Sequence, residues 1–326
     1  MAKKTALITG ISGQDGAYLA RLLLQKDYRV VGLVRRTASQ HEMLHRLQWL
    51  QVADRVEIFC GDLSDVSSLI RIIRDIQPHE IYNLAAQSFV HASWDQPLLT
   101  AGVTGMGALN LFEACRIIAP DARIYQASSS EMFGKIQEDV QTETTPFYPR
   151  SPYAVAKVFA HWSGINYRES YDMHISNGIL FNHESPLRGI EFVTRKVTAA
   201  VAEIKSGKRD ILEMGNMDAE RDWGHAQDYV EAMWAMLQQD HADDYVIATG
   251  KTRSIRELCD VAFTVVGLQA GNYVQSNAKF FRPAEVDRLL GGADKAREKL
   301  GWQAQTSFED MIGEMVEADL QRLKNA

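Results

Sequence analysis

Three glycines follow the first apolar run of the chain, in the stretch T-A-L-I-T-G-I-S-G-Q-D-G at residues 5–16. Glycine permits a tight turn and lets the backbone come close to a bound group. The start of a helix presents unpaired amide N–H groups and a positive dipole end to an anion. This order is typical of a pyrophosphate-binding unit: a strand, then a turn with Gly10, Gly13 and Gly16, then a helix. The alternative is a tight turn that binds no ligand.

Short β-type runs alternate with helical patterns through the first half of the chain. We expect strands at residues 5–9, 29–34, 56–60, 80–84, 123–127 and 174–180, and crossover helices at 17–26, 65–76, 99–118 and 153–170. This order predicts an α/β fold, a Rossmann-type doubly wound parallel sheet.

The pattern changes at about residue 183, where loops mix with expected helices at 191–206, 227–239, 254–266 and 306–324. We therefore predict a dinucleotide-binding domain over residues 1–182 and a smaller α/β substrate-binding cap over 183–326. Residues 245–249, Y-V-I-A-T, form another buried strand pattern. A segment near 220–250 is thus expected to return to the first sheet.

Composition limits the classes of protein to which the chain can belong. Lys and Arg number 35 against 42 Asp and Glu, and this net charge of -7 argues against a nucleic-acid surface. Cys60, Cys115 and Cys259 lie far apart without metal-ligand spacing, so we expect no metal and reduced thiols in the cytoplasm. The N-terminal apolar run is too short for a signal peptide, and no run of about 20 apolar residues stands out, so no membrane is expected.

The second expected strand ends at Arg35 and Arg36, where an NAD-binding chain places an acidic residue against the ribose 2′-OH. Two guanidinium groups instead suit a 2′-phosphate and favour NADP, although a solvated basic pair is the alternative. Residues after the third and fourth strands are expected to line the adenine and nicotinamide ends, and small residues there also serve packing. The predicted cofactor contacts up to this point are Gly10, Ile11, Ser12, Gly13, Gln14, Asp15, Gly16, Arg35, Arg36, Asp62, Leu63, Leu84, Ala85, Ala86, Gln87 and Ser88.

Tyr153 and Lys157 are one helical turn apart, so both side chains project from one helix face. This spacing is common by chance and is more often structural when it stands alone. Behind a dinucleotide turn it predicts alcohol oxidation, with Tyr153 as the base and Lys157 lowering its pKa from about 10. Ser129, at a strand end, would hydrogen-bond the same substrate oxygen.

Glu131 stands two residues after Ser129, in A-S-S-S-E-M-F-G at residues 127–134. The simplest interpretation of these serines is a polar turn, and we assign Ser128 a structural role. Oxidation of one carbon makes the neighbouring C–H acidic, and a carboxylate can then remove that proton while a hydroxyl leaves as water. Because a simple dehydrogenase or epimerase needs no such base, Glu131 predicts a dehydratase.

With these residues assembled, nearly the whole chain resembles the extended short-chain dehydrogenase/reductase family, in its branch of nucleotide-sugar 4,6-dehydratases. The resemblance rests on T-G-I-S-G-Q-D-G-A-Y-L-A, Y-N-L-A-A-Q-S, Y-Q-A-S-S-S-E-M-F-G, F-Y-P-R-S-P-Y-A-V-A-K, F-N-H-E-S-P-L-R-G, F-V-T-R-K and R-D-W-G-H-A-Q-D-Y-V. Ser129 departs from the threonine usual in the family but keeps the hydroxyl. Ser130 stands where the dTDP-glucose dehydratases place an aspartate, which favours a GDP-mannose substrate.

The resemblance implies Ser129 as the active-site hydroxyl, Glu131 as the C5 base and Tyr153 as the C4 base supported by Lys157. It also implies His183 and Arg188 as NADP contacts. The implied contacts to GDP-mannose are Ser88, Asn182, Val193, Lys196, Arg221, Arg282 and Glu285.

The resemblance also gives expectations for the quaternary structure and the activity. It implies a homo-tetramer or homodimer, with residues 37–46 near the cofactor phosphate and a neighbouring subunit. Another nucleotide-sugar 4,6-dehydratase, a C4 reductase or a non-catalytic NADP-binding module remain alternatives.

Overall fold

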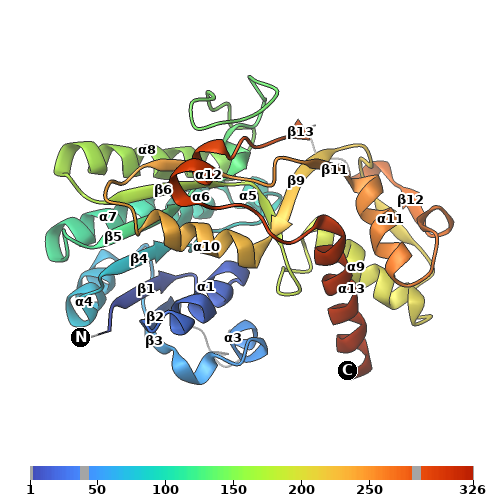
Figure 1. Cartoon of the computed structure of the whole chain (residues 1–326), viewed down its shortest axis with the longest axis horizontal. Helices are drawn as coiled ribbons and strands as arrows, with labels where there is room; N and C mark the ends of the chain where they lie inside the picture. Colours follow the sequence, from blue (N-terminus) through green and yellow to red (C-terminus); the bar gives the residue numbers. More distant parts are fainter. Residues whose placement is uncertain (1–2, 37–43, 281–287, 326) are drawn as a thin grey trace.

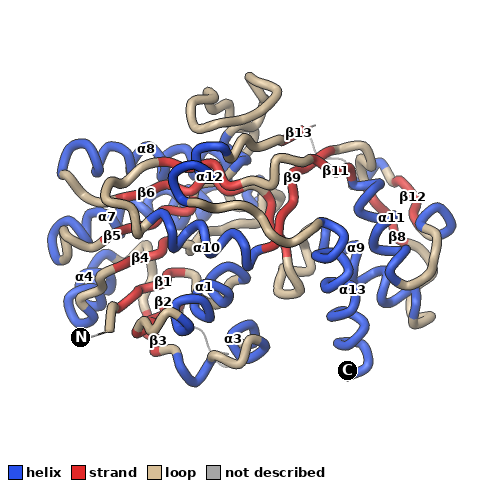
Figure 2. Tube along the Cα trace, in the orientation of Figure 1, coloured by secondary structure: helices blue, strands red, loops and turns tan. Residues whose placement is uncertain are grey.

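The computed structural model describes residues 3–36, 44–280 and 288–325. A seven-stranded sheet dominates it, with all neighbouring strands parallel, in the order β10-β6-β5-β4-β1-β2-β3 (Figures 1 and 2). Its strands are β1 (Thr5–Thr9), β2 (Arg29–Val34), β3 (Glu57–Cys60), β4 (Glu80–Asn83), β5 (Arg123–Ala127), β6 (Ile175–Leu180) and β10 (Asp244–Ile247). The predicted doubly wound parallel sheet is confirmed.

Helices cover both faces of this sheet because its strands carry apolar side chains on each side. Along β1, Ala6 and Ile8 join the core beneath α1 and α10, whereas Leu7 joins the core beneath α4, α7 and α8. These helices are α1 (Gln14–Gln25), α4 (Val66–Ile76), α7 (Gly107–Ile118), α8 (Pro152–Tyr171) and α10 (Ala226–Met236). Because successive side chains point to opposite faces and both faces are covered by helices, the strands are recognisable in the sequence as short, almost continuous apolar runs.

A second group of elements lies at the other end of the molecule, on the right in Figure 1. One sheet joins β7 (Asn182–Glu184), β9 (Glu220–His225), β11 (Thr252–Ser254) and β13 (Arg288–Leu289), and a two-stranded sheet joins β8 (Leu212–Met214) and β12 (Val274–Ser276). Helices α9 (Val193–Lys205), α11 (Ile255–Val265) and α13 (Phe308–Asn325) share a separate core. The smaller helices are α3 (His45–Trp49), α5 (Ala92–Asp95), α12 (Asp294–Leu300) and the 3-10 turns η1 (Ala53–Arg55), η3 (Ser130–Met132), η4 (Ala270–Asn272) and η5 (Ala278–Phe280).

The chain crosses between the two ends more than once. The predicted return of residues 245–249 is confirmed, because β10 pairs with β6 at the edge of the large sheet. Helix α12 packs on β10 and α10 after a further crossing. The division into domains at residues 182 and 183 stays a prediction.

One helical stretch has the length and composition of a membrane span, as a buried core helix also can. Helix α6 (Pro97–Thr100), the π-helical η2 (Ala101–Met106) and α7 form one run, Pro97–Ile118, which is long and apolar enough to cross a membrane. Asn110 and the charged Glu113 and Arg116 interrupt its apolar run. Half of the stretch is buried in the protein, where it packs on α4 and α8.

Candidate active site

A cavity of about 680 Å³ lies at the carboxyl ends of β1, β4, β5 and β6, where these face the sheet that contains β7 and β9. Ligands of open parallel sheets bind at this edge, because the loops that follow the strands converge there. The predicted residues that line the cavity are Gly10, Gly13, Gln14, Asp15, Gly16, Leu84, Ala86, Ser88, Ser129, Glu131, Tyr153, Lys157, Asn182, His183, Arg188, Val193, Lys196 and Arg221.

The glycine turn has no room for side chains. Gly10 has a φ of +71°, and a Cβ there would lie 2.8 Å from the amide nitrogen of Ala85. A Cβ on Gly16 would lie 2.5 Å from both the Gly10 carbonyl oxygen and the Ile11 Cα. Gly13 begins α1 without a side-chain cap, so the helix start suits an anion. These constraints fit the pyrophosphate of a dinucleotide.

The four predicted catalytic residues meet at the end of β5 and the start of α8. The Ser129 hydroxyl accepts a hydrogen bond from the Glu131 amide at 3.2 Å and lies close enough to the Tyr153 phenol to lower its pKa. The Lys157 ammonium donates to the Ala127 carbonyl oxygen at 2.7 Å and lies 5.8 Å from the centre of the Tyr153 ring. Ser151 begins α8 by accepting from the Ala154 amide.

Burial controls the ionisation of Tyr153 and Lys157. It raises the pKa of the Tyr153 phenol to about 12, although the Ser129 hydroxyl opposes this shift. It lowers the pKa of Lys157 to about 8. The pKa of Tyr153 thus moves opposite to the lowering that the sequence predicts. The reason is that loss of hydration around the phenolate outweighs the charges close to it.

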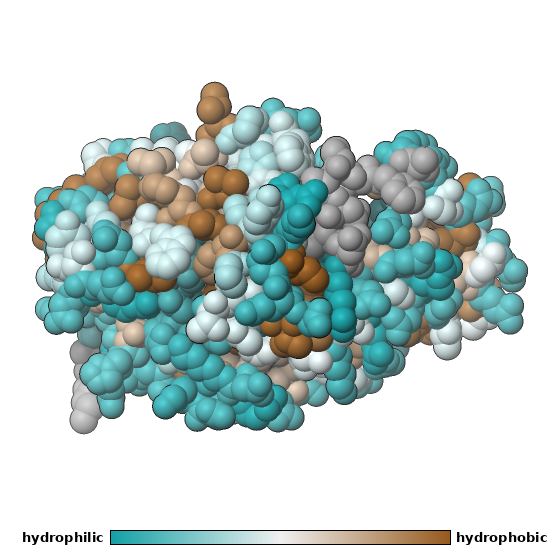
Figure 3. Space-filling view, turned by 90° about the horizontal axis from the view of Figure 1, so that it is seen from above, coloured by the Kyte–Doolittle hydropathy of each residue, from teal (hydrophilic) through white to brown (hydrophobic). Residues whose placement is uncertain are grey.

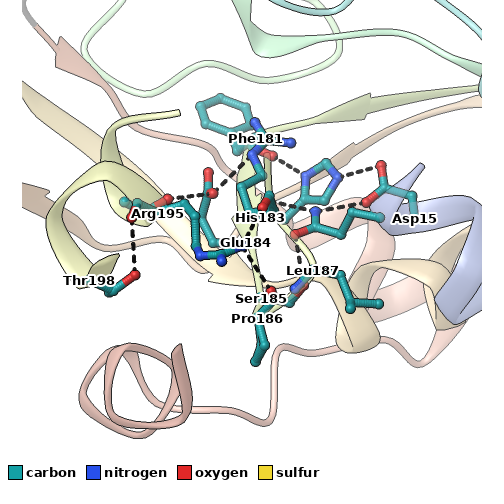
Figure 4. Close-up of polar contacts among 12 residues, drawn as sticks. Asp15, Phe181, His183, Glu184, Ser185, Pro186, Leu187, Arg195 and Thr198 are labelled. Carbon is teal, nitrogen blue, oxygen red and sulfur yellow. Dashed lines mark hydrogen bonds and ion pairs between the residues drawn. The ribbon is translucent and has the colours of Figure 1, made fainter. Parts of the chain in front are cut away.

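A charged pair joins the glycine turn to β7 (Figure 4). His183 Nε2 lies 2.9 Å from Asp15 Oδ2, and Nδ1 lies 2.7 Å from the Phe181 carbonyl oxygen. The Asp15 carboxylate and the Phe181 carbonyl oxygen can only accept hydrogen bonds, so both ring nitrogens of His183 donate. A ring that donates from both nitrogens is an imidazolium. Burial alone would raise the pKa of Asp15, but His183 lowers it to about 2. Burial alone would lower the pKa of His183, but Asp15 raises it.

The loop after β7 is held by further buried contacts, some of them drawn in Figure 4. The Gln14 side chain donates to the His183 carbonyl oxygen and accepts from Ser185. Arg195, paired with Asp319 at 2.7 Å, donates to the carbonyl oxygens of Pro186 and Arg188. The loop is therefore fixed from both α1 and α9.

Arg188 lies at the wall of the cavity. Its Nε stands 3.0 Å from the buried Glu184 carboxylate without hydrogen-bond geometry, and its guanidinium covers the Phe192 ring at 3.5 Å. Asn182 Oδ1 is buried without a partner. The loop thus offers a cation and an unsatisfied acceptor.

The opposite wall carries predicted substrate contacts. Lys196 donates to the Glu213 carbonyl oxygen at 2.8 Å and lies 4.2 Å from the centre of the Phe280 ring. Arg221 is buried in β9 and donates to the Glu220 carbonyl oxygen. Trp223 stacks on Phe308, and it also lines the cavity with its Nε1 buried without a hydrogen-bond partner.

Several predicted contacts do not line the cavity. Arg35 and Arg36 follow β2 and are exposed. Arg282, Glu285 and residues 37–43 lie outside the described residues. The other predicted contacts outside the lining are Ile11, Ser12, Asp62, Leu63, Ala85 and Gln87.

Sequence reasoning missed some residues of the lining, including Phe89, His91, Glu184, Phe192, Asn216 and Phe280. They come from loops and short strands without a periodic signal. Adjacency to a predicted contact, as for Phe89 and Glu184, is the only local cue. Within residues 3–36, 44–280 and 288–325, no group of His, Cys, Asp and Glu is arranged to hold a metal ion.

The doubly wound sheet, the glycine turn and the Ser129, Tyr153 and Lys157 set define an extended short-chain dehydrogenase/reductase. The family model described as GDP-mannose 4,6 dehydratase matches residues 7–315. The chain therefore belongs to that family.

A relative agrees with this assignment, and solved structures share the fold. The GDP-mannose 4,6-dehydratase of Sinorhizobium fredii is 49% identical over 344 residues, which cover 99% of this chain and 98% of the relative. The dTDP-glucose 4,6-dehydratase DesIV of Streptomyces venezuelae, solved with NAD, is 23% identical with a TM-score of 0.87, covering 98% of each chain. RMD of Pseudomonas aeruginosa, solved with NADPH, is 22% identical with a TM-score of 0.80, covering 98% of this chain and 100% of that one.

Proposed function

We propose that the chain dehydrates GDP-mannose to GDP-4-dehydro-6-deoxy-D-mannose with NADP as cofactor. The observation that carries the proposal is the placement of Glu131 in the same cavity as Ser129 and Tyr153. Membership of the dehydratase family supports the same substrate.

The glycine turn and the exposed pair Arg35 and Arg36 are the proposed NADP contacts. The turn fits a pyrophosphate because a Cβ on Gly10 or Gly16 would collide with backbone. The two guanidinium groups would hold the 2′-phosphate. When bound, NADP would supply the hydride acceptor for oxidation at C4 and the hydride donor for C6.

The side chains of the cavity move the protons. Tyr153 takes the proton of the C4 hydroxyl as C4 becomes a carbonyl. Ser129 Oγ accepts from the Glu131 amide, and its hydroxyl proton would be donated to that sugar oxygen when the substrate is bound. Glu131 then removes the C5 proton, which the new carbonyl acidifies, and passes it to the C6 hydroxyl, which leaves as water. C5 takes up a proton when the hydride returns to C6, and release of the proton held by Tyr153 balances that uptake. The pKa of Tyr153, about 12 by burial, must fall for the first transfer, and a bound, oxidised nicotinamide would contribute its positive charge to that fall.

Incubation with GDP-mannose and a trace of NADP tests the proposal. A 4-keto sugar should accumulate without net consumption of NADP, because the hydride is returned. A C4 reductase would instead consume NADPH in proportion to product. A chain that binds NADP and turns over no nucleotide sugar would be a binding module.

The Glu131→Gln variant tests the role of the carboxylate. We expect NADP binding to be retained and dehydration to fall by about a hundredfold or more, as for loss of a general base. Binding is measured by calorimetry and turnover by the 4-keto product. Unchanged turnover would remove Glu131 from the mechanism.

A further inference from the structure

Three consecutive residues at the end of β5 contact three side chains of α8. This helix packs on β5 and β6 (Figure 1). The Ala127 carbonyl oxygen accepts from Lys157, and Ser129 is close enough to Tyr153 to lower the pKa of its phenol. Between them, Ser128 Oγ lies 2.9 Å from His161 Nδ1. His161 follows Lys157 by four residues, as Lys157 follows Tyr153, so all three lie on one face of α8.

The Ser128–His161 contact is inside the protein. Ser128 is 5% exposed and His161 is 3% exposed. The Phe147 ring meets the imidazole edge to face at 5.1 Å between centres. Burial lowers the pKa of His161 to about 4, so the ring is neutral at pH 7. A neutral imidazole nitrogen and a hydroxyl form one hydrogen bond whichever of the two donates.

The contact joins the two segments that carry the reacting groups. Ser129 and Glu131 follow Ser128 in the chain, and Tyr153 precedes His161 by two turns of α8. Loss of the imidazole would leave the buried Ser128 hydroxyl without this partner, and the strand end would move to satisfy it. A misplacement of about 1 Å can cost about a hundredfold in rate.

We propose that His161 is a positioning residue, which fixes the strand end bearing Ser129 and Glu131 against α8 through its hydrogen bond to Ser128. The proposal rests on the proposed dehydration, since it assigns His161 a role in that site. His161 acts through Ser128, because His161 itself does not line the cavity. Ser128, structural by sequence, thereby becomes part of the support of the site.

The test compares His161→Leu with His161→Asn, whose amide can reproduce the polar atom at Nδ1. We expect His161→Leu to lower kcat by about tenfold or more, with KM for GDP-mannose and the Kd of NADP changed less than about twofold. His161→Asn should restore most of kcat. The control is His225→Leu, because His225 is also buried, with 4% exposed, and its ring also forms hydrogen bonds: Nδ1 accepts from the Gln227 amide at 3.0 Å, and Nε2 lies 3.0 Å from Glu314 Oε2. This control should lower the Tm and leave kcat unchanged.

A double-mutant cycle with Ser128→Ala separates this proposal from the proposed function. If the hydrogen bond carries the effect, the double variant should be no worse than His161→Leu alone, both in kcat and in unfolding free energy. Additive losses in both would overturn the proposal, as would a His161→Leu variant with lowered Tm and wild-type kcat. A wild type without dehydratase activity would contradict the proposed function alone, because the coupling in unfolding is measurable without turnover.

Discussion

Gly16 shows how a single atom limits the glycine turn. A Cβ there would lie 2.5 Å from the Gly10 carbonyl oxygen and the Ile11 Cα, both of them backbone atoms that cannot swing aside. We expect Gly16→Ala to weaken NADP binding by about tenfold or more and to cost about 1–3 kcal/mol of unfolding free energy. Calorimetric titration and urea unfolding measure the two effects.

Gly313 provides the control, since it lies in α13 and a Cβ there would have no atom within 4 Å. Gly313→Ala should raise the unfolding free energy by about 0.5–1 kcal/mol through helix propensity and leave NADP binding unchanged. Equal NADP affinity in both variants would contradict the steric argument.

His161 should also make stability depend on pH. Burial first, and Arg168 after it, hold its folded pKa at about 4 against 6.5 in the unfolded chain, while Asp244 opposes them. The unfolded state therefore binds the proton first, so stability is full above pH 6.5 and is lost as pH falls toward 4. We expect a loss of about 2 kcal/mol between pH 7.5 and 5 from this group. Urea unfolding of wild type and His161→Asn measures it, and parallel pH profiles would contradict it.

At the scale of the element, the first turn of α8 determines where Tyr153 lies. Ser151 caps this helix through the Ala154 amide at 3.1 Å. We expect Ser151→Ala to cost about 1 kcal/mol and to lower kcat as the first turn frays. Ser307→Ala is the comparison, because Ser307 accepts from the Asp310 amide at 3.0 Å at the start of α13, away from the cavity. It should cost similar stability in thermal unfolding with kcat unchanged, and a shared loss of kcat would contradict the local effect.

At the scale of the whole molecule, exposed apolar side chains gather on one run of helices. Leu98, Met106, Val155, Phe159 and Trp162 are all exposed, the last three on the outer face of α8. Figure 3 shows apolar residues in brown mainly over the half of the molecule that holds the large sheet. Exposed apolar patches of this kind are typical of subunit contacts.

We therefore expect a homodimer or homo-tetramer in solution, with α8 in a contact between copies. Light scattering with and without NADP should give two or four times the mass of one chain. Phe159→Asp should lower that mass, whereas Val265→Asp, at an exposed apolar position on α11, should not. A monomeric wild type in both conditions would contradict the expectation.

The sequence by itself determined the large sheet, its crossover helices, the glycine turn and the shared face of Tyr153 and Lys157. These features are local, because they follow from period-2 and period-3.6 patterns and from backbone that only glycine can adopt. Even the return of β10 was readable, since the four apolar residues from Tyr245 to Ala248 carry a strand pattern without reference to their partner.

Only the tertiary structure decided the second sheet and the electrostatics of the site. Strands such as β13, with two residues, have no period and exist through pairing with β9. The Asp15–His183 pair spans 168 residues of sequence, and neither pKa shift has a local signal. The raised pKa of Tyr153 and the Ser128–His161 bond likewise depend on burial, which arises when distant segments exclude water together.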